Sequence, residues 1–195
     1  LKHYGDLVFD ILDFIMNQRH ENLFLHENGL LYSDGKNKPI SWMNSTIYGK
    51  PLVPRTGYLV EFNALWYNAL RFGAELAETA KKEHLTVIYN NQSDVTGSSF
   101  INTFLNKHGY LFDFVDNSKQ DWCVRPNMVF AASLEYSPLK KKKKKSVLDY
   151  ITKELLTPKG LRSLSPKSNG YNPNYEGNEE QRARACHQGT AWPWL

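Results

Sequence analysis

The amino-acid sequence predicts a mainly α-helical domain. Several segments repeat apolar residues every three or four positions, which is the spacing of one face of an α-helix. Neither half of the chain shows the alternating pattern of successive strands. The chain has 195 residues, 41% hydrophobic and 23% charged, which suffices for one ordinary domain with a core of its own.

The first two predicted helices flank a long irregular segment. Residues 5–18 and 59–82 each repeat apolar residues at helical spacing, so we expect two amphipathic helices. Glu61 falls in the first turn of the second helix, where the helix dipole favours a carboxylate. Residues 20–58 lack any period and are rich in Gly, Asn, Asp and Pro, so they predict a loop. A loop of that length in a compact domain is usually functional or disordered, and its aromatic residues argue against disorder.

The second half of the chain predicts three further helices, which span residues 94–106, 128–134 and 143–155. Ser93 or Asp94 is a suitable N-cap for the first, and Pro126 is placed near the start of the second. Residues 110–115 alternate briefly, which indicates a short extended segment or a buried turn. Residues 161–184 are rich in Gly, Asn and Pro and predict a loop.

The charge is concentrated in one run. The formal net charge is +4, and Lys140–Lys145 alone carries six positive charges. Nucleic-acid-binding proteins usually spread basic residues over a face and interleave them with aromatic residues. We therefore interpret the run as a solvated helix entry, with a polyanion contact as the alternative, and predict no nucleic-acid partner.

The two cysteines, Cys123 and Cys186, lie far apart and form no CxxC motif. This pattern favours reduced thiols and a cytoplasmic location. No His and Cys residues have the spacing of a metal site. No apolar stretch approaches the roughly 18 residues of a membrane span, so no membrane partner is predicted. The chain starts at Leu1 and stops on apolar residues, which suggests part of a longer protein.

The first candidate site residues lie in irregular segments that lead into helices, where sites usually occur. Glu61 and Asn63 stand among apolar neighbours at a helix start, and Trp42 and Trp66 lie nearby in sequence. Carboxylate and amide groups beside indole faces suit a pyranose, since polar groups bind the hydroxyls and its apolar face lies on the ring. The structural alternative is that Glu61 stabilises the helix start and Asn63 satisfies a turn.

Two further clusters follow along the chain. Arg125 belongs to the segment 121–127 and is a candidate for substrate binding or for a structural ion pair. The third cluster combines residues 160–166 with the aromatic and polar residues near the C-terminus. No convincing Ser/His/Asp arrangement and no glycine-rich phosphate loop is present.

These clusters, in this order, resemble the C-terminal domain of glycogen debranching enzymes, the amylo-α-1,6-glucosidase family. The matching stretches are SWMN (41–44), PRTGYLVEFNALWYNAL (54–70), RPNMVFAAS (125–133), GLRSLSP (160–166) and HQGTAWPWL (187–195). The resemblance as a whole extends over nearly all 195 residues. The short pieces are weak individually, but their combination is specific.

The resemblance implies part of an (α/α)6 toroid with the active site at one mouth, so residues 1–195 would form a single, incomplete catalytic domain. It implies hydrolysis of α-1,6-linked glucose stubs in glycogen or limit dextrin by an inverting pair of carboxylates, without metal or cofactor. The expected partners are the branched glucan and the remainder of the catalytic domain, and this chain alone is expected to be inactive. The implied substrate-binding residues are Trp42, Arg55, Asn63, Trp66, Arg125, Asn127, Arg162, His187, Gln188 and Trp192.

The sequence departs from the family pattern at the usual acid position. Asn44 stands where the family has an Asp as its general acid, and an amide does not donate a proton in that way. Glu61 is the nearest carboxylate in the sequence that could act as the general acid in place of that Asp. The alternative role for Glu61 is substrate binding. The general base is expected beyond Leu195. Two alternatives follow: a non-catalytic glucan-binding relative, or a related glycosidase of the glucoamylase or trehalase kind.

Overall fold

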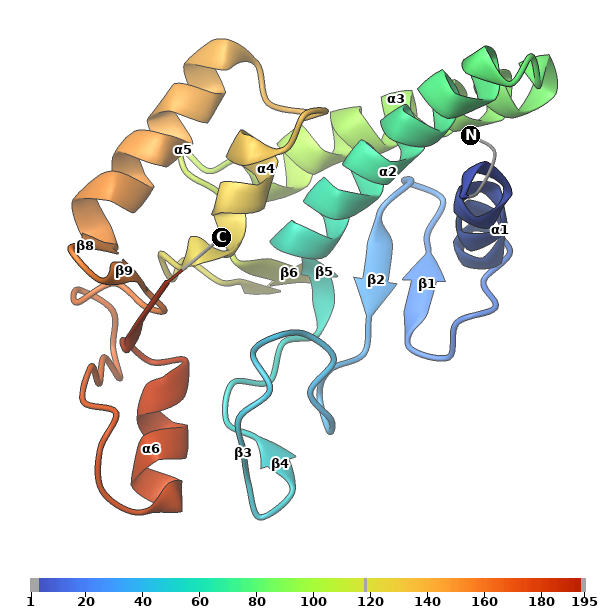
Figure 1. The fold of residues 1–195 in the computed structure, drawn as a ribbon. Helices are drawn as coiled ribbons and strands as arrows, with labels where there is room; N and C mark the ends of the chain where they lie inside the picture. Colours follow the sequence, from blue (N-terminus) through green and yellow to red (C-terminus); the bar gives the residue numbers. More distant parts are fainter. Residues whose placement is uncertain (1–3, 118, 194–195) are drawn as a thin grey trace.

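The computed structural model describes residues 4–117 and 119–193. Within them the chain forms six α-helices, one 3-10 turn and three antiparallel sheets (Figure 1). The helices are α1 (Gly5–Met16), α2 (Val60–Thr79), α3 (Glu83–Phe104), η1 (Pro126–Met128), α4 (Val129–Ser133), α5 (Lys141–Glu154) and α6 (Glu179–Cys186). The strands are β1 (Leu23–Leu25), β2 (Leu31–Ser33), β3 (Thr46–Ile47), β4 (Lys50–Pro51), β5 (Gly57–Leu59), β6 (Phe114–Asp116), β7 (Lys119–Gln120), β8 (Leu156–Thr157), β9 (Gly160–Arg162) and β10 (Ala191–Trp192).

The prediction of a mainly α-helical domain that forms part of an (α/α)6 toroid is therefore wrong. The fold is mixed, because the irregular segments between the helices pair into sheets. Every strand is only two or three residues long, which is too short to display an alternating pattern in the sequence. Pairing decides these strands, and not local periodicity: some pairs are local hairpins such as β3–β4, and others join distant segments, as β5 and β6 do.

The largest sheet has five strands in the order β1-β2-β5-β6-β7. β1, β2 and all but the last residue of β5 come from residues 20–58, predicted as a loop. Its central register pairs Tyr32 with Tyr58, and Tyr58 with Val115. Gly57 has a φ of +104°, and a Cβ there would collide with the carbonyl oxygen of Val115. Only glycine allows this close pairing of β5 and β6.

Helices α2 and α3 lie side by side above this sheet (Figure 1). The predicted helix at 59–82 is confirmed as α2, and α1 confirms the helix predicted at 5–18. In α2, Gly73 allows close packing, since a Cβ there would meet Leu12 of α1 and Tyr89 of α3. Helix α3 begins eleven residues before the predicted 94–106, and Ser93, proposed as an N-cap, is buried inside it.

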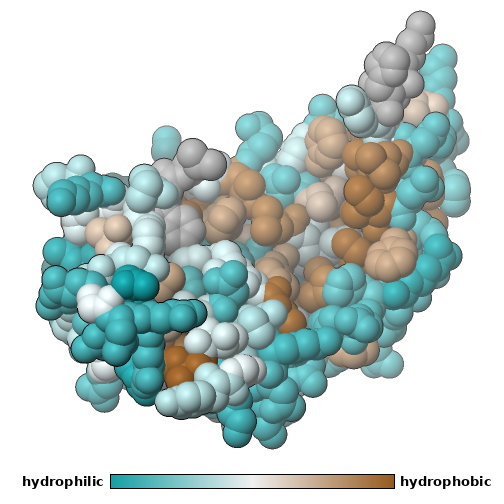
Figure 2. Space-filling view, turned by 60° about the horizontal axis from the view of Figure 1, so that its bottom comes forward, coloured by the Kyte–Doolittle hydropathy of each residue, from teal (hydrophilic) through white to brown (hydrophobic). Residues whose placement is uncertain are grey.

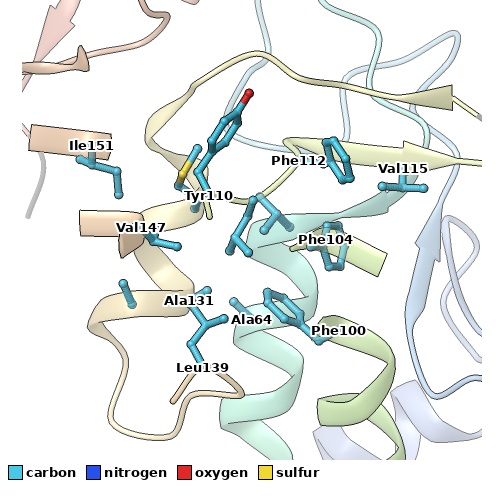
Figure 3. Packing of buried hydrophobic residues seen from close by; sticks show 14 of the residues in the cluster. Ala64, Phe100, Phe104, Tyr110, Phe112, Val115, Ala131, Leu139, Val147 and Ile151 are labelled. Carbon is cyan, nitrogen blue, oxygen red and sulfur yellow. The ribbon is translucent and has the colours of Figure 1, made fainter. Parts of the chain in front are cut away.

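The main hydrophobic core joins α2, α3, α4 and α5 to the strands of the large sheet (Figure 3). Phe100 and Phe104 of α3 pack with ring centroids 4.8 Å apart, next to Ala64 of α2. Leu111, fully buried, follows α3 and leads into β6. This packing holds the segment 110–115 at the centre of the molecule. The segment ends in β6, in agreement with the predicted extended segment.

The lysine run starts α5. Lys140 is the N-cap and Lys141–Lys145 form the first part of the helix, which agrees with the helix predicted at 143–155. Val147 and Ile151 turn toward the main core and are buried. The run therefore stands at a helix entry, with Lys145 paired to Asp149 at 2.7 Å.

Apolar side chains also gather on the surface. Figure 2 shows them gathered mainly on the right of the face in view, the side on which α1 lies in Figure 1. An open apolar groove of about 220 Å³ lies between α1 and α2, lined by Ile15, Leu23, Leu31, Phe62, Leu65, Trp66 and Ala69. None of the described helices is both long enough and apolar enough to cross a membrane.

Candidate functional site

The centre of the candidate site is Asp113, a carboxylate that precedes β6 and is only 1% exposed. Its Oδ2 lies 2.8 Å from Nε of Arg55 and 3.9 Å from Nε of Arg125. Its Oδ1 accepts a hydrogen bond of 2.6 Å from Asn127. Burial raises the pKa of Asp113, and the two guanidinium groups oppose this shift. A buried carboxylate requires such partners, because an unpaired charge in the interior is strongly unfavourable.

Arg55 joins Asp113 to Glu61 in the first turn of α2. Its two terminal nitrogens donate to the two oxygens of Glu61 at 2.5 and 2.8 Å, a bidentate geometry that arginine favours. Both side chains are buried. Burial alone would lower the pKa of Arg55, but Asp113 and Glu61 raise it above its ordinary value. Two arginines and two carboxylates thus form a buried cluster with no formal net charge.

Arg125 connects the cluster to the C-terminal segment. It donates to the carbonyl oxygens of Ser163 and His187 at 3.1 and 2.6 Å, and to Oε1 of Gln188 at 2.8 Å. Residues 125, 163 and 187 belong to three separate matching stretches of the sequence, 125–133, 160–166 and 187–195. One buried guanidinium therefore holds the three segments together.

An apolar pocket opens beside this network. It has a volume of about 240 Å³ and is lined by Trp42, Cys186, His187, Trp192 and Pro193. The indole nitrogen of Trp42 donates to Oδ1 of Asn127 at 2.7 Å, and that of Trp192 to the carbonyl oxygen of Cys186 at 2.9 Å. These bonds orient two indoles at the pocket.

His187 is the polar side chain of this pocket. Its ring lies edge-on to Trp42, with centroids 5.0 Å apart, and only 4% of the residue is exposed. Among the described residues, neither ring nitrogen has a hydrogen-bond partner. Burial lowers the pKa of His187 to about 4, and Arg125 and Arg55 contribute. The imidazole is therefore neutral near pH 7, with one donor and one acceptor.

The structure places the other expected site residues elsewhere. Asn63 is fully buried and bonds to the backbone of Leu31 and Leu59, so it joins α2 to β2. Trp66 donates to the carbonyl oxygen of Gly29 and lines the apolar groove between α1 and α2. Arg162 lies on β9 and donates to the Tyr171 hydroxyl at 3.2 Å.

Comparison with known proteins decides the family. The sequence matches the family described as amylo-alpha-1,6-glucosidase over residues 3–195. The chain belongs to this family. It is also 23% identical to the glycogen debranching enzyme of Saccharomyces cerevisiae (strain ATCC 204508 / S288c), over 94% of this chain and 15% of that protein. The chain therefore spans about 15% of the length of the curated relative that it matches.

In this member of the amylo-alpha-1,6-glucosidase family, Asn44 follows Trp42 by two positions, and its side chain is exposed. Its backbone N–H donates to the carbonyl oxygen of Trp42 at 2.9 Å. The residue at the expected acid position is thus bonded to the backbone of Trp42, which lines the indole pocket, but it does not line the pocket itself. Trp194 and Leu195, the last residues of the final motif, lie outside the described part of the chain.

The sequence interpretation missed Asp113. The segment Tyr110–Val115 was expected to be extended or a buried turn, without a polar role. One signal was available: a single carboxylate stands between Phe112 and Phe114, and a charge within such an apolar run must find buried partners. The sequence does not show that those partners are Arg55 and Arg125, because they are 58 and 12 positions away.

Proposed function

We propose that this chain forms the glucan-binding part of an amylo-α-1,6-glucosidase, a glycoside hydrolase that releases α-1,6-linked glucose stubs from glycogen or limit dextrin. Family membership supports the reaction class. The observation that carries the assignment is His187, a buried neutral imidazole without a partner among the described residues, in a pocket that also contains Trp42 and Trp192.

The pocket offers both kinds of contact that a glucose unit requires. The apolar face of the sugar lies against the indole of Trp42 or Trp192. Both ring nitrogens of His187 are covered in this structure, so the imidazole turns toward the ligand on binding. A hydroxyl group both donates and accepts, so it then pairs with either ring nitrogen. Leaving a buried polar group unpaired is unfavourable by about 1–3 kcal/mol, so ligand binding stabilises this side chain as well as the sugar.

The buried carboxylates serve this site as positioning groups. Both oxygens of Glu61 accept bonds from Arg55, and Asp113 orients Asn127 and through it Trp42. All four carboxylate oxygens are engaged by Arg55 or Asn127, so neither carboxylate is free to exchange a proton with a bound sugar. For the inverting mechanism, in which an acid and a base stand on opposite sides of the sugar, we assign this chain the binding and orientation of the glucose unit.

A non-catalytic glucan-binding relative is the second candidate, and Asn44 favours it. An amide at the expected acid position does not protonate the leaving oxygen, whereas the pocket remains intact. In this case, the protein binds branched glucan through the same residues without cleaving it.

Glucose release from limit dextrin by the full-length protein distinguishes the two candidates. We expect release from the wild type and its loss in Trp42→Ala and His187→Ala. Release without any dependence on these two residues would contradict the pocket assignment. No release from the wild type, together with release by Asn44→Asp, would identify a binding relative. If the wild type neither releases glucose nor binds glucan, both candidates are overturned.

A further inference from the structure

A second cleft lies next to the indole pocket and is not used by the proposed glucose site. It has a volume of about 370 Å³ and is lined by Thr46, Ile47, Tyr48, Asn178, Glu179, Glu180 and Ala183. One wall is the β3–β4 hairpin and the other is α6, which project side by side from the same side of the molecule (Figure 1).

The two cavities lie along the same two stretches of chain, although no residue lines both. Trp42 precedes the hairpin by four residues on one side, and Cys186 ends α6 on the other. The walls of the second cleft are the continuation of these same stretches, at residues 46–48 and 178–183. A ligand that occupies the indole pocket and extends from it between the two walls enters the second cleft. This arrangement fits a polymer, whose units repeat along a line.

Tyr48 shows an unusual conformation at the end of the hairpin. It is 91% exposed and has a φ of +49°, and Gly49 follows with a φ of +73°. Such a two-residue turn favours Asn-Gly, because a bulky side chain is strained in the left-handed region. Strained residues persist at binding and catalytic sites more than elsewhere. The hairpin therefore holds an aromatic ring in solvent, at the edge of a cleft, at a position where an asparagine would be more stable.

The polar residues of the cleft select the ligand. Glu179 presents a carboxylate, and Glu180 keeps one carboxylate oxygen, Oε2, since its Oε1 is paired with Arg184. Carboxylate oxygens accept hydrogen bonds from hydroxyl groups. Asn178 is bound to Gln181 as the capping box of α6, so that wall is ordered. An aromatic ring opposite carboxylates suits an uncharged, polyhydroxylated chain and disfavours a nucleic acid or another polyanion.

We propose that the cleft between the β3–β4 hairpin and α6 binds the linear α-1,4-glucan chain that carries the branch, with Tyr48 stacking on a glucose unit. This inference rests on the proposed function, since the branch stub would then occupy the pocket at Trp42 and His187. The cleft binds the main chain of the same substrate and so favours stubs on long chains over isolated disaccharides.

Linear maltohexaose tests the cleft separately from hydrolysis, because it contains no α-1,6 bond. Its dissociation constant is measured by calorimetry on the full-length protein. We expect Tyr48→Asn to weaken binding about five- to tenfold, and Tyr48→Phe to keep most of it, since the ring remains. Tyr4→Ala removes another highly exposed tyrosine, at the N-cap of α1, and serves as the matched control.

The melting temperature excludes misfolding as the cause. Asn is more favourable than Tyr at positive φ, so Tyr48→Asn should melt no lower than the wild type. Unchanged maltohexaose binding in this variant would overturn the proposal, as would a wild type that releases glucose from limit dextrin but does not bind maltohexaose. If glucose release fails while maltohexaose binding depends on Tyr48, the cleft stands and only the proposed reaction is rejected.

Discussion

The side-chain amide of Asn127 donates a hydrogen bond of 2.6 Å to Oδ1 of Asp113. Because the amide nitrogen is engaged by a carboxylate, the amide oxygen faces the other way and accepts from the indole of Trp42 at 2.7 Å. The buried charge cluster thereby orients an indole of the pocket. If the proposed function is correct, a residue without contact to the sugar sets the orientation of an indole that binds it.

Replacing Asn127 by Ala should lower both stability and glucan affinity. The change leaves Asp113 Oδ1 and the Trp42 indole without their partner, at an expected loss of about 1–3 kcal/mol in the free energy of unfolding. Urea unfolding measures this loss, and calorimetry with a branched oligosaccharide measures the affinity. Asn102→Ala, on the exposed face of α3, should change neither quantity. Equal affinity in wild type and Asn127→Ala would show that Trp42 is oriented independently.

Arg55 and Glu61 should prove strongly coupled. Arg55→Met leaves Glu61 and Asp113 buried with fewer partners, and breaking a buried pair in this way destabilises by about 3–5 kcal/mol. The double variant Arg55→Met/Glu61→Met removes one of the stranded charges and should recover part of that loss. Urea unfolding of the four proteins forms a double-mutant cycle. Strictly additive losses would refute the coupling.

The stability of the protein should depend on His187 in mild acid. Its pKa is about 4 when folded and near 6.5 when unfolded, so the unfolded chain binds more protons between these values. The free energy of unfolding should therefore fall as the pH drops from about 6.5 to 4. His187→Gln has no group that titrates there, so its urea midpoint should fall less over the same range. Parallel pH profiles of the two proteins would contradict this account.

The lysines at the start of α5 should oppose its helix dipole. Lys141 and Lys142 are exposed in the first turn, where positive charge is unfavourable. Replacing each by Glu should raise the free energy of unfolding by about 0.3–1 kcal/mol at low salt. Lys153→Glu, in the last turn of the same helix, should lower the free energy of unfolding instead. Loss of both effects in high salt would confirm their electrostatic origin.

Two glycines provide a test of the sheet geometry. Both Gly57 and Gly49 have positive φ, but a Cβ at residue 57 would collide with Val115, whereas nothing lies within 4 Å of one at residue 49. Gly49→Ala should lower the free energy of unfolding by about 1 kcal/mol through backbone strain alone. Gly57→Ala should lower the free energy of unfolding by clearly more, because β5 and β6 must move apart to make room for the new Cβ. Thermal unfolding measures both, and equal losses would contradict the close pairing.

Most helices were predictable because their signal is local. The apolar period of α2 appears directly in its sequence, and the structure buries the same face. Helix α3 was predicted only in its second half, since the stretch around Asn90 and Gln92 is polar. That stretch is helical because Tyr89, Ser93 and Thr96 pack against the rest of the protein. Packing of this kind overrides weak local preference.

The site was predictable in part. Trp42, Arg125, Asn127 and His187 were all identified as candidates, because polar and aromatic residues in long irregular segments indicate a site. The structure brings these four together, whereas it separates Asn63, Trp66 and Arg162 from them. The position of a residue within a matching motif did not show toward which neighbours its side chain on α2 or β9 points.

The sequence by itself determined the family, the amphipathic helices and the segments that carry the site, because these depend on residue types and short spacings. Only the tertiary structure decided the sheets, the central role of Asp113 and the arrangement of its two arginines. The physical reason is that two-residue strands and buried charges have no stable form alone. Each requires a partner elsewhere in the chain, close by in a hairpin or far away as for Asp113 and Arg55, and folding determines which partner it meets.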